Sequence, residues 1–251
     1  WGLWFGHIEG TNTGSIMLSI DADRLSEGFI CFYDSNPRIS STRVVMSLQR
    51  NGKHLKGHSS NVFPFFNTPE QEKSADFVPP TEIHFSAQLQ DDWSLEGEWY
   101  TDVDTKGSLT LQYNEYNEPS PPDRTFDWNQ FKDFIHQNAI DNPGAIYRGQ
   151  SNSEWPLRTT FHRSCRRNLF RYQNEDLAIL NKHLAPLLGR KFELENGMDL
   201  SELVLLAQHH GYPTPFLDWT NSPYVAAFFG FSSLDKYQLN NGKVRVFILY
   251  G

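Results

Sequence analysis

The sequence predicts two domains, an N-terminal all-β antiparallel barrel or sandwich at residues 1–114 and a C-terminal α+β domain at residues 126–251. Short runs of alternating apolar residues dominate the first half, as strands require. Apolar residues at helical spacing dominate the second half. A proline-rich stretch separates the two, and 251 residues suffice for two domains of roughly 100–200 residues.

Five segments of the first half are predicted strands because they are short and bounded by turn residues: 15–20, 28–33, 43–48, 82–89 and 108–113. Asn51-Gly52 predicts a hairpin, since both residues tolerate the positive φ of a type I′ turn. A weak repeat places Gly-x-Trp before a glycine turn twice, at residues 2–16 and 97–109. Hairpins at both ends of the domain could close a barrel.

Each copy of the repeat contains one tryptophan, Trp4 or Trp99, which we interpret first as a core residue. The Gly-x-Trp motif resembles the opening of lipocalin-like barrels. No catalytic constellation is evident in this half of the sequence.

Residues 115–125 are a predicted linker, because three of the four residues 119–122 are proline and favour extended backbone. Charge also changes at this boundary. Residues 1–121 contain 17 acidic and 8 basic side chains, whereas residues 122–251 contain 13 and 14. We therefore expect only the second half to approach a polyanion.

Helices of the second half are predicted from apolar spacing between Trp128 and Ala139 and between Leu177 and Leu188. Asp199 and Glu202 resemble a capping pair at the start of a third helix. Ser222-Pro223 predicts the N-cap and first residue of a fourth, over 224–231. The apolar strand at 244–250 ends the sequence, so we expect the domain to be truncated at its C-terminus.

Two separated cysteines, Cys31 and Cys165, provide neither a disulfide framework nor a metal-binding pair. This usage favours a reducing, cytoplasmic location. We expect no metal site. We also expect no membrane association, because no run of about 18 apolar residues occurs.

Two motifs of the second half place polar residues directly after short apolar runs. Tyr147-Arg148-Gly149-Gln150 follows Ala145-Ile146, and Asp218-Trp219-Thr220 follows Phe216-Leu217. With Gln208, His209, Gly211, Pro213 and Thr214 these residues resemble the FRG domain family over about residues 126–251. The sequence departs from the family pattern at His210, where an aromatic residue is usual, and at Pro215, where a basic residue is common.

The FRG domain in turn resembles the ADP-ribosyltransferase superfamily. This resemblance implies an ADP-ribosyltransferase-like fold, NAD as co-substrate and Arg148 as the residue that anchors it. The catalytic glutamate of that superfamily would follow Gly251, so the catalytic residue is unknown here, and Asp218 is not assigned that role.

NAD contains a pyrophosphate, which suits a bidentate arginine. Trp219 or Tyr212 could stack on nicotinamide, and a threonine hydroxyl could position the ribose. The predicted NAD-binding residues are Arg148, Gln150, Arg163, His209, Thr214, Asp218, Trp219 and Thr220.

Structural alternatives stay open for several of these residues. Arg148 and Asp218 could form a buried ion pair that joins two strands. His209 and His210 could interact with a helix C-terminus, and Trp219 could be a core residue.

A basic cluster provides Arg158, Arg166, Arg167 and Arg171, which could contact a protein or nucleic-acid acceptor. The alternative is a solvated helix face. Two functions are therefore compatible with the sequence. One is an NAD-using, ADP-ribosyltransferase-like enzyme, a toxin or defence effector that modifies a macromolecule. The other is a non-enzymatic nucleotide- or nucleic-acid-binding module with a partner-binding β domain.

Overall fold

The computed structural model describes residues 1–65, 79–114, 120–232, 234 and 242–251. Its contacts divide the chain into two compact units. Unit 1 contains Trp1–Glu115 and Thr160–Pro215, and unit 2 contains Tyr116–Thr159 and Phe216–Gly251. These units are defined by contacts, and the domain boundaries predicted at residues 114 and 126 stay a prediction. Residues 115–119 of the predicted linker lie outside the described residues.

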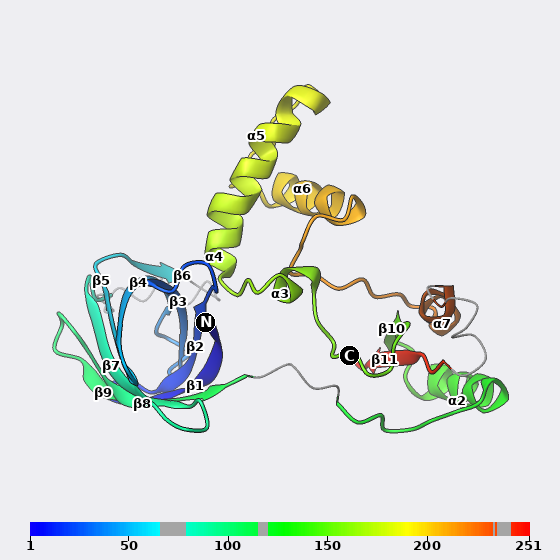
Figure 1. The fold of residues 1–251 in the computed structure, drawn as a ribbon, viewed down its shortest axis with the longest axis horizontal. Helices are drawn as coiled ribbons and strands as arrows, with labels where there is room; N and C mark the ends of the chain where they lie inside the picture. Colours follow the sequence, from blue (N-terminus) through cyan, green and yellow to red (C-terminus); the bar gives the residue numbers. More distant parts are fainter. Residues whose placement is uncertain (66–78, 115–119, 233, 235–241) are drawn as a thin grey trace. The chain divides into compact units, whose positions relative to one another are not determined.

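Unit 1 contains a closed, antiparallel, eight-stranded barrel, which confirms the predicted all-β fold and selects a barrel over a sandwich (Figure 1). Around the ring each strand pairs with the next one along the chain, except that β5 pairs with β7, and β9 pairs with β1 to close the ring. A ninth strand, β6, extends β5 along the first part of β4. The strands are β1 (Gly2–Gly10), β2 (Gly14–Ile20), β3 (Glu27–Asp34), β4 (Ser41–Asn51), β5 (His54–Ser59), β6 (Val62–Phe65), β7 (Ile83–Leu89), β8 (Leu95–Thr101) and β9 (Lys106–Tyr113).

The weak sequence repeat corresponds to the two hairpins that close the barrel. One is β1–β2 and the other is β8–β9, and β1 pairs with β9 from Trp4↔Tyr113 to Gly10↔Gly107. Trp4 and Trp99 are both buried in the barrel core, as predicted. Closure leaves no unpaired sheet edge around the ring.

The predicted hairpin after β4 is present, but its turn lies one residue later than expected. Asn51 pairs with His54 and belongs to the strand, so Gly52 and Lys53 form the loop. Only Gly52 has a positive φ, of 61°. The type I′ turn predicted at Asn51-Gly52 is therefore wrong, because the last pair of the β4–β5 ladder includes Asn51.

Strand β5 was not predicted, because its inward positions lack the usual apolar side chains. Gly57 and Ser59 occupy two of them. A Cβ atom on Gly57 would lie 2.1 Å from the Phe85 ring, so that ring takes the volume of the missing side chain. Apolar content alone does not reveal such a strand.

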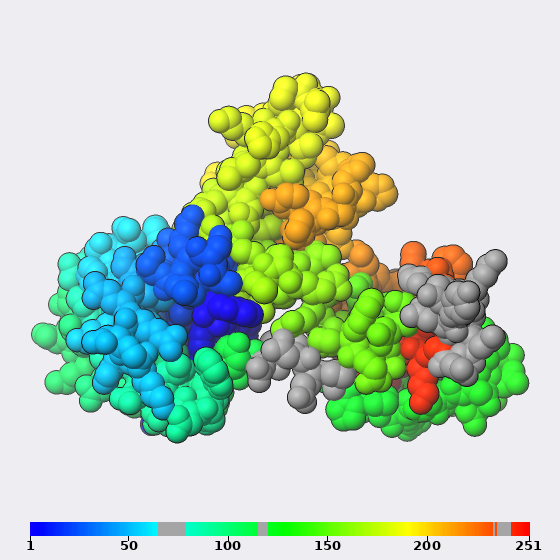
Figure 2. Space-filling model, in the orientation of Figure 1, coloured from blue at the N-terminus to red at the C-terminus, as the bar shows by residue number. Residues whose placement is uncertain are grey.

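The rest of unit 1 is helical and forms its own apolar cluster around Phe161, Tyr172, Leu177 and Leu203. Helices α5 and α6 pack against each other (Figures 1 and 2). The elements are α3 (Thr160–Arg163), α4 (Leu169–Arg171), the π-helical turn η1 (Tyr172–Asp176), α5 (Leu177–Leu188) and α6 (Gly197–His209).

Helix α5 has the predicted bounds and ends at Gly189 in the left-handed conformation, a frequent helix stop. The predicted start of α6 is wrong. Its N-cap is Asn196, whose side chain accepts hydrogen bonds from the main-chain N–H groups of Met198 and Asp199. Asp199 instead lies in the first turn, where a carboxylate interacts favourably with the helix dipole.

Unit 2 consists of α2 (Trp128–Asp141), β10 (Ile146–Gln150), α7 (Pro223–Ser232) and β11 (Arg245–Leu249). Helix α2 confirms the predicted spacing and begins at a capping box of Asp127 and Gln130. The predicted N-cap of α7 is also confirmed, since the Ser222 hydroxyl accepts a hydrogen bond from the Val225 N–H. Among the described residues, no helix combines the length and apolarity needed to span a bilayer.

Candidate functional site

The two polar motifs meet at strand β10. On one side β10 pairs with β11, from Ile146↔Leu249 to Gln150↔Arg245. On the other side Tyr147 forms an isolated bridge with Thr220, with N···O distances of 2.7 and 2.9 Å. Segments about seventy residues apart therefore lie side by side in unit 2.

Arg148 lies at the centre of this arrangement and is half-buried. Its Nη1 donates a hydrogen bond to the main-chain carbonyl oxygen of Asp218 at 2.8 Å. The Asp218 side chain is exposed. This bond fixes the direction of the Arg148 side chain, and it links the arginine to the second motif through the backbone.

Glycine follows Arg148 because helix α7 lies directly against β10. A Cβ atom at Gly149 would be 1.7 Å from the Ala226 carbonyl oxygen and 2.9 Å from the Gly230 nitrogen. Tyr147 lies two residues before Gly149 and therefore on the same face of β10. It is buried and packs with Ile135 and Ala226. The face of β10 that carries Tyr147 and Gly149 is therefore the core face.

Because side chains alternate along a strand, Arg148 and Gln150 belong to the opposite face. Register places Phe247 opposite Arg148 and Arg245 opposite Gln150. Arg148 and Arg245 are thus diagonal neighbours, which in antiparallel pairs are about 7–8 Å apart. We call Arg148, Gln150, Arg245 and Phe247 the arginine face of the β10–β11 sheet.

Arg245 was missed in the sequence analysis. Its guanidinium lies over the Phe247 ring, with Cζ 5.6 Å from the ring centroid. Its Nη1 donates a hydrogen bond to the Ser120 carbonyl oxygen at 2.7 Å. The available signal was Arg245 itself, a single charged residue within the otherwise apolar predicted strand at 244–250.

Two further predicted residues of unit 2, Gln150 and Thr220, have defined polar partners. Gln150 Nε2 donates to the carbonyl oxygens of Asn152 and Trp155 at 3.1 and 2.6 Å. The Thr220 hydroxyl oxygen accepts the Ser222 N–H at 3.1 Å, a bond that leaves the hydroxyl proton available to donate. Trp219 is half-buried, so its side chain is neither a full core residue nor fully exposed.

Beyond the end of the sheet lies a cleft of about 290 Å³. It is lined by Ser151, Asn152, Ser153, Glu154, Leu234, Gly242 and Lys243. The cleft follows directly after Gln150 along the chain, and most of its lining is polar.

Three of the eight predicted residues belong to unit 1. Arg163 ends α3 and His209 lies in the last turn of α6, and both are exposed. The His209 ring meets the His210 ring edge-on at 5.2 Å between centroids. The position of His209 in the last turn agrees with the helix-terminus alternative.

Thr214 is fully buried and joins two loops of unit 1. Its hydroxyl donates to Gln208 Oε1 at 3.0 Å, and its N–H donates to the Thr160 hydroxyl at 2.9 Å. The Phe161 N–H donates to its carbonyl oxygen at 3.2 Å. These bonds give Thr214 a structural role in unit 1. Its contact with NAD stays a prediction.

Much of the basic cluster forms ion pairs within unit 1. We call Asp21, Asp23, Arg24, Arg166, Arg171, Glu175 and Asp176 the Asp21 cluster. Asp21 follows β2, so these pairs join the barrel to α4 and η1. A nucleic-acid or protein contact through Arg158, Arg166, Arg167 and Arg171 stays a prediction, and for Arg166 and Arg171 it would compete with these carboxylates.

Arg167 is itself buried. Its Nη1 donates to the main-chain carbonyl oxygens of His162 and Arg166, at 2.7 Å each. Its guanidinium also lies 5.4 Å from the Trp1 ring centroid. An arginine in this environment holds the chain together and presents little surface to a partner.

The Asp21 cluster predicts acid sensitivity. Hydrogen bonding to Arg24 holds the pKa of Glu175 below its usual range, and hydrogen bonding to Arg171 does the same for Asp23. A carboxyl whose pKa is lower in the folded state stabilises the fold above the unfolded-state pKa, and this contribution disappears as pH falls through the folded-state pKa. We therefore expect the free energy of unfolding to decrease progressively below about pH 4.5.

Urea unfolding at pH 7, 5, 4 and 3 measures this effect. Glu175→Gln should flatten the decrease between pH 4.5 and 3, whereas Glu202→Gln, which removes an exposed partner of Arg190, should not. Equal pH dependence in the Glu175→Gln and wild-type proteins would contradict the assignment.

A second polar grouping lies on the outer face of the barrel. His58 and His84 are paired across β5 and β7, and with Glu82 they place one ligand atom each within 4.8 Å of the others. The His84 ring also stacks on Tyr100 at 4.6 Å. Three such groups could contribute to a zinc site, which usually takes four ligands.

Comparison with known families identifies part of the chain. Residues 143–238 match the model of the FRG domain family, a range that includes both polar motifs. This match supports the resemblance found in the sequence. No curated protein and no solved structure gives a match.

Proposed function

We propose that the FRG domain of this chain binds NAD through the arginine face of the β10–β11 sheet. The observation that carries the proposal is the position of Arg148, half-buried on β10 and bonded to the backbone of the second motif. The second arginine, Arg245, is its diagonal neighbour on the same face. Two guanidinium groups suit the two negative charges of a pyrophosphate.

The residues of unit 2 fit the other parts of NAD by type. Thr220 can donate a hydrogen bond to a ribose oxygen, because its bond with the Ser222 N–H uses the hydroxyl oxygen as acceptor. Trp219 offers a half-buried aromatic surface for the nicotinamide ring. Gln150 already donates to two carbonyl oxygens, so we assign it to shaping the site.

NAD when bound would supply an activated glycosidic bond, whose cleavage passes through an oxocarbenium-like state. Cleavage also needs a well-placed carboxylate. The family resemblance does not locate that group within the FRG residues of this sequence, so the proposal concerns binding. Transfer of ADP-ribose to a macromolecule, by a toxin or defence effector, is the reaction class that the resemblance implies.

Calorimetric titration of the folded chain with NAD tests the proposal. We expect a Kd of about 1 mM or tighter, equivalent to roughly −4 kcal/mol or better. Arg148→Ala should weaken binding at least tenfold, because it removes the charge at the centre of the site. Arg148→Lys should recover only part of the loss, since lysine keeps the charge but not the bidentate geometry.

Arg124→Ala is the matched control, because it removes an arginine of the same unit that lies over the Phe134 ring. Thermal unfolding confirms that each variant is folded. If the folded wild-type chain does not bind NAD, the proposal fails. The non-enzymatic module that binds another nucleotide or a nucleic acid then becomes the better hypothesis.

A further inference from the structure

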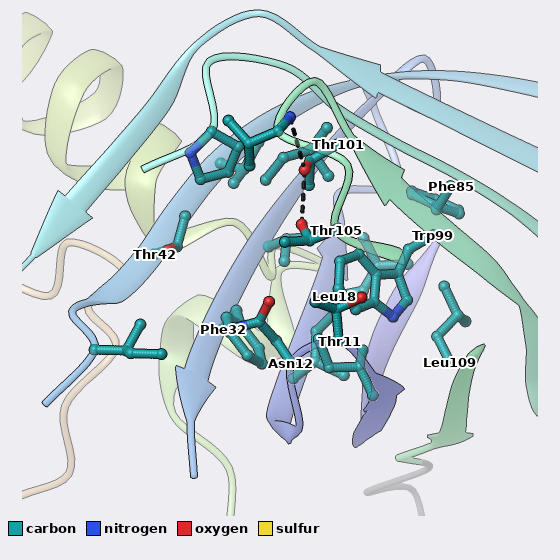
Figure 3. A pocket seen from close by; sticks show the side chains of 18 of the residues that line it. Thr11, Asn12, Leu18, Phe32, Thr42, Phe85, Trp99, Thr101, Thr105 and Leu109 are labelled. Atoms are coloured by element: carbon teal, nitrogen blue, oxygen red, sulfur yellow. Dashed lines mark hydrogen bonds between the residues drawn. The ribbon is translucent and has the colours of Figure 1, made fainter. Parts of the chain in front are cut away.

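Among the described residues, the side chains of the unit 1 barrel leave part of its interior unfilled. It encloses a cavity of about 430 Å³, lined by residues from most of the strands (Figure 3). Eight-stranded barrels are either packed with side chains or hold one small ligand. The volume here lies within the roughly 300–1,000 Å³ typical of small-molecule sites.

Aromatic residues pack together at one end of the barrel. The Trp4 indole N–H donates to the Trp93 carbonyl oxygen at 2.9 Å. Tyr113 packs against both tryptophans, with ring centroids 5.2 Å from Trp4 and 6.0 Å from Trp93. These residues belong to the barrel end that contains the start of β1 and the end of β9.

The polar lining residues all belong to the opposite end. They come from the β1–β2 connection, the start of β4 and the β8–β9 hairpin, and they are Thr11, Asn12, Thr42, Thr101 and Thr105. Thr101 and Thr105 are joined hydroxyl to hydroxyl at 2.7 Å (Figure 3). Asn12 Nδ2 donates to Asp34 at 2.9 Å. This end of the cavity can therefore exchange hydrogen bonds with a ligand.

The remaining lining is apolar and includes Leu18, Phe85, Trp99 and Leu109 (Figure 3). No lining residue in the described part of the chain is charged. The apolar walls of this cavity lack the dispersion contacts of a packed core. An apolar guest restores those contacts, whereas a buried charge would have no counter-ion.

We infer that the barrel binds an uncharged, mainly apolar small molecule that carries a hydroxyl or carbonyl group at one end. The apolar part occupies the space around Leu18 and Trp99, and the polar group lies among the threonines and Asn12. This site belongs to unit 1 and is independent of the proposed NAD site.

The first test uses the uncharged fluorophore N-phenyl-1-naphthylamine with the full chain. We expect its emission to increase and saturate on binding. Decanol should displace it at a concentration at least tenfold lower than decanoate, which has the same chain length but a negative charge. No emission increase with folded protein would overturn the inference, and displacement by decanoate at equal or lower concentration would overturn the uncharged class.

The second test locates the site. Leu109→Phe adds volume inside the cavity and should weaken probe binding at least tenfold. Thr110→Phe places the same side chain on the next residue of β9, which faces outward, and should bind as wild type does. If Leu109→Phe does not fold, Ile16→Phe makes the same change from β2. Unchanged binding by a folded cavity variant would overturn the location.

Discussion

Replacing Asp21 by alanine lowers the free energy of unfolding by about 3–5 kcal/mol, the usual cost of breaking a buried ion pair. Asp21 is 1% exposed. Its carboxylate accepts hydrogen bonds from Arg166 Nε at 2.8 Å, from Arg171 Nη1 at 3.1 Å and from the Asn168 N–H at 2.8 Å. The substitution leaves two partly buried guanidinium groups without this partner and removes the acceptor of a buried main-chain donor.

Equilibrium urea unfolding of Asp21→Ala measures the loss. Asp91→Ala provides the control, because Asp91 is an exposed aspartate whose ion pair with Lys53 lies at the barrel surface. Exposed pairs contribute about 0–1 kcal/mol, so this control should unfold almost as wild type does. A change of less than 1 kcal/mol for Asp21→Ala would show that its partners find equivalent bonds elsewhere.

The Asp21 cluster also shows what a charge run in the sequence does not reveal, namely the ion-pair partners of its residues. Arg166 and Arg171 occur in a basic stretch, and from sequence alone they suit a nucleic-acid acceptor. Their carboxylate partner Asp21 is about 145 residues away, just after a predicted strand. No spacing along the sequence indicates that these residues pair. Local patterns contain no information about such a long-range contact.

The barrel was predictable because its evidence is local. Alternating apolar residues define most strands, and the Gly-x-Trp repeat marks the two hairpins that pair to close the ring. The cavity was not predictable, because its volume depends on how side chains from several strands combine. Trp99 illustrates this difference, since it was correctly predicted as buried, yet it also lines the cavity.

The candidate site was predicted in part. The motifs around Arg148 and Thr220 lie side by side. The sequence suggested this, because each motif places polar residues directly after a short apolar run. The segment Phe216–Trp219 forms no strand, because only Thr220 bridges to β10. Arg245 was missed because its importance depends on the register of β11, which no local pattern fixes.

Gly149→Ala should disrupt the packing of α7 on β10 and destabilise unit 2 by at least about 4 kcal/mol, a value at the exceptional end for single substitutions. The added Cβ would lie 1.7 Å from the Ala226 carbonyl oxygen and 2.9 Å from the Gly230 nitrogen. Both are backbone atoms of one helix, so no side-chain rotation relieves the overlap. The helix must move away from the strand.

Hydrogen exchange of the α7 and β10 amides measures this change where it occurs, since local opening raises exchange rates in the affected elements. Gly144→Ala is the matched control, because a Cβ atom there meets nothing within 4 Å, and its exchange should match wild type. Slow, wild-type exchange in Gly149→Ala would contradict the close approach of α7.

The same substitution separates structure from binding in the proposed site. Tyr147 and Gly149 hold α7 on one face of β10, which leaves Arg148 on the other. If α7 moves, the core face loses its support, and the direction of Arg148 is no longer fixed. Gly149→Ala should therefore weaken NAD binding although it removes no group that would touch NAD, whereas Arg148→Ala should weaken binding with unchanged exchange in α7. We therefore expect the glycine of the motif to affect the proposed site through helix α7, and the arginine to affect it through direct contact with NAD.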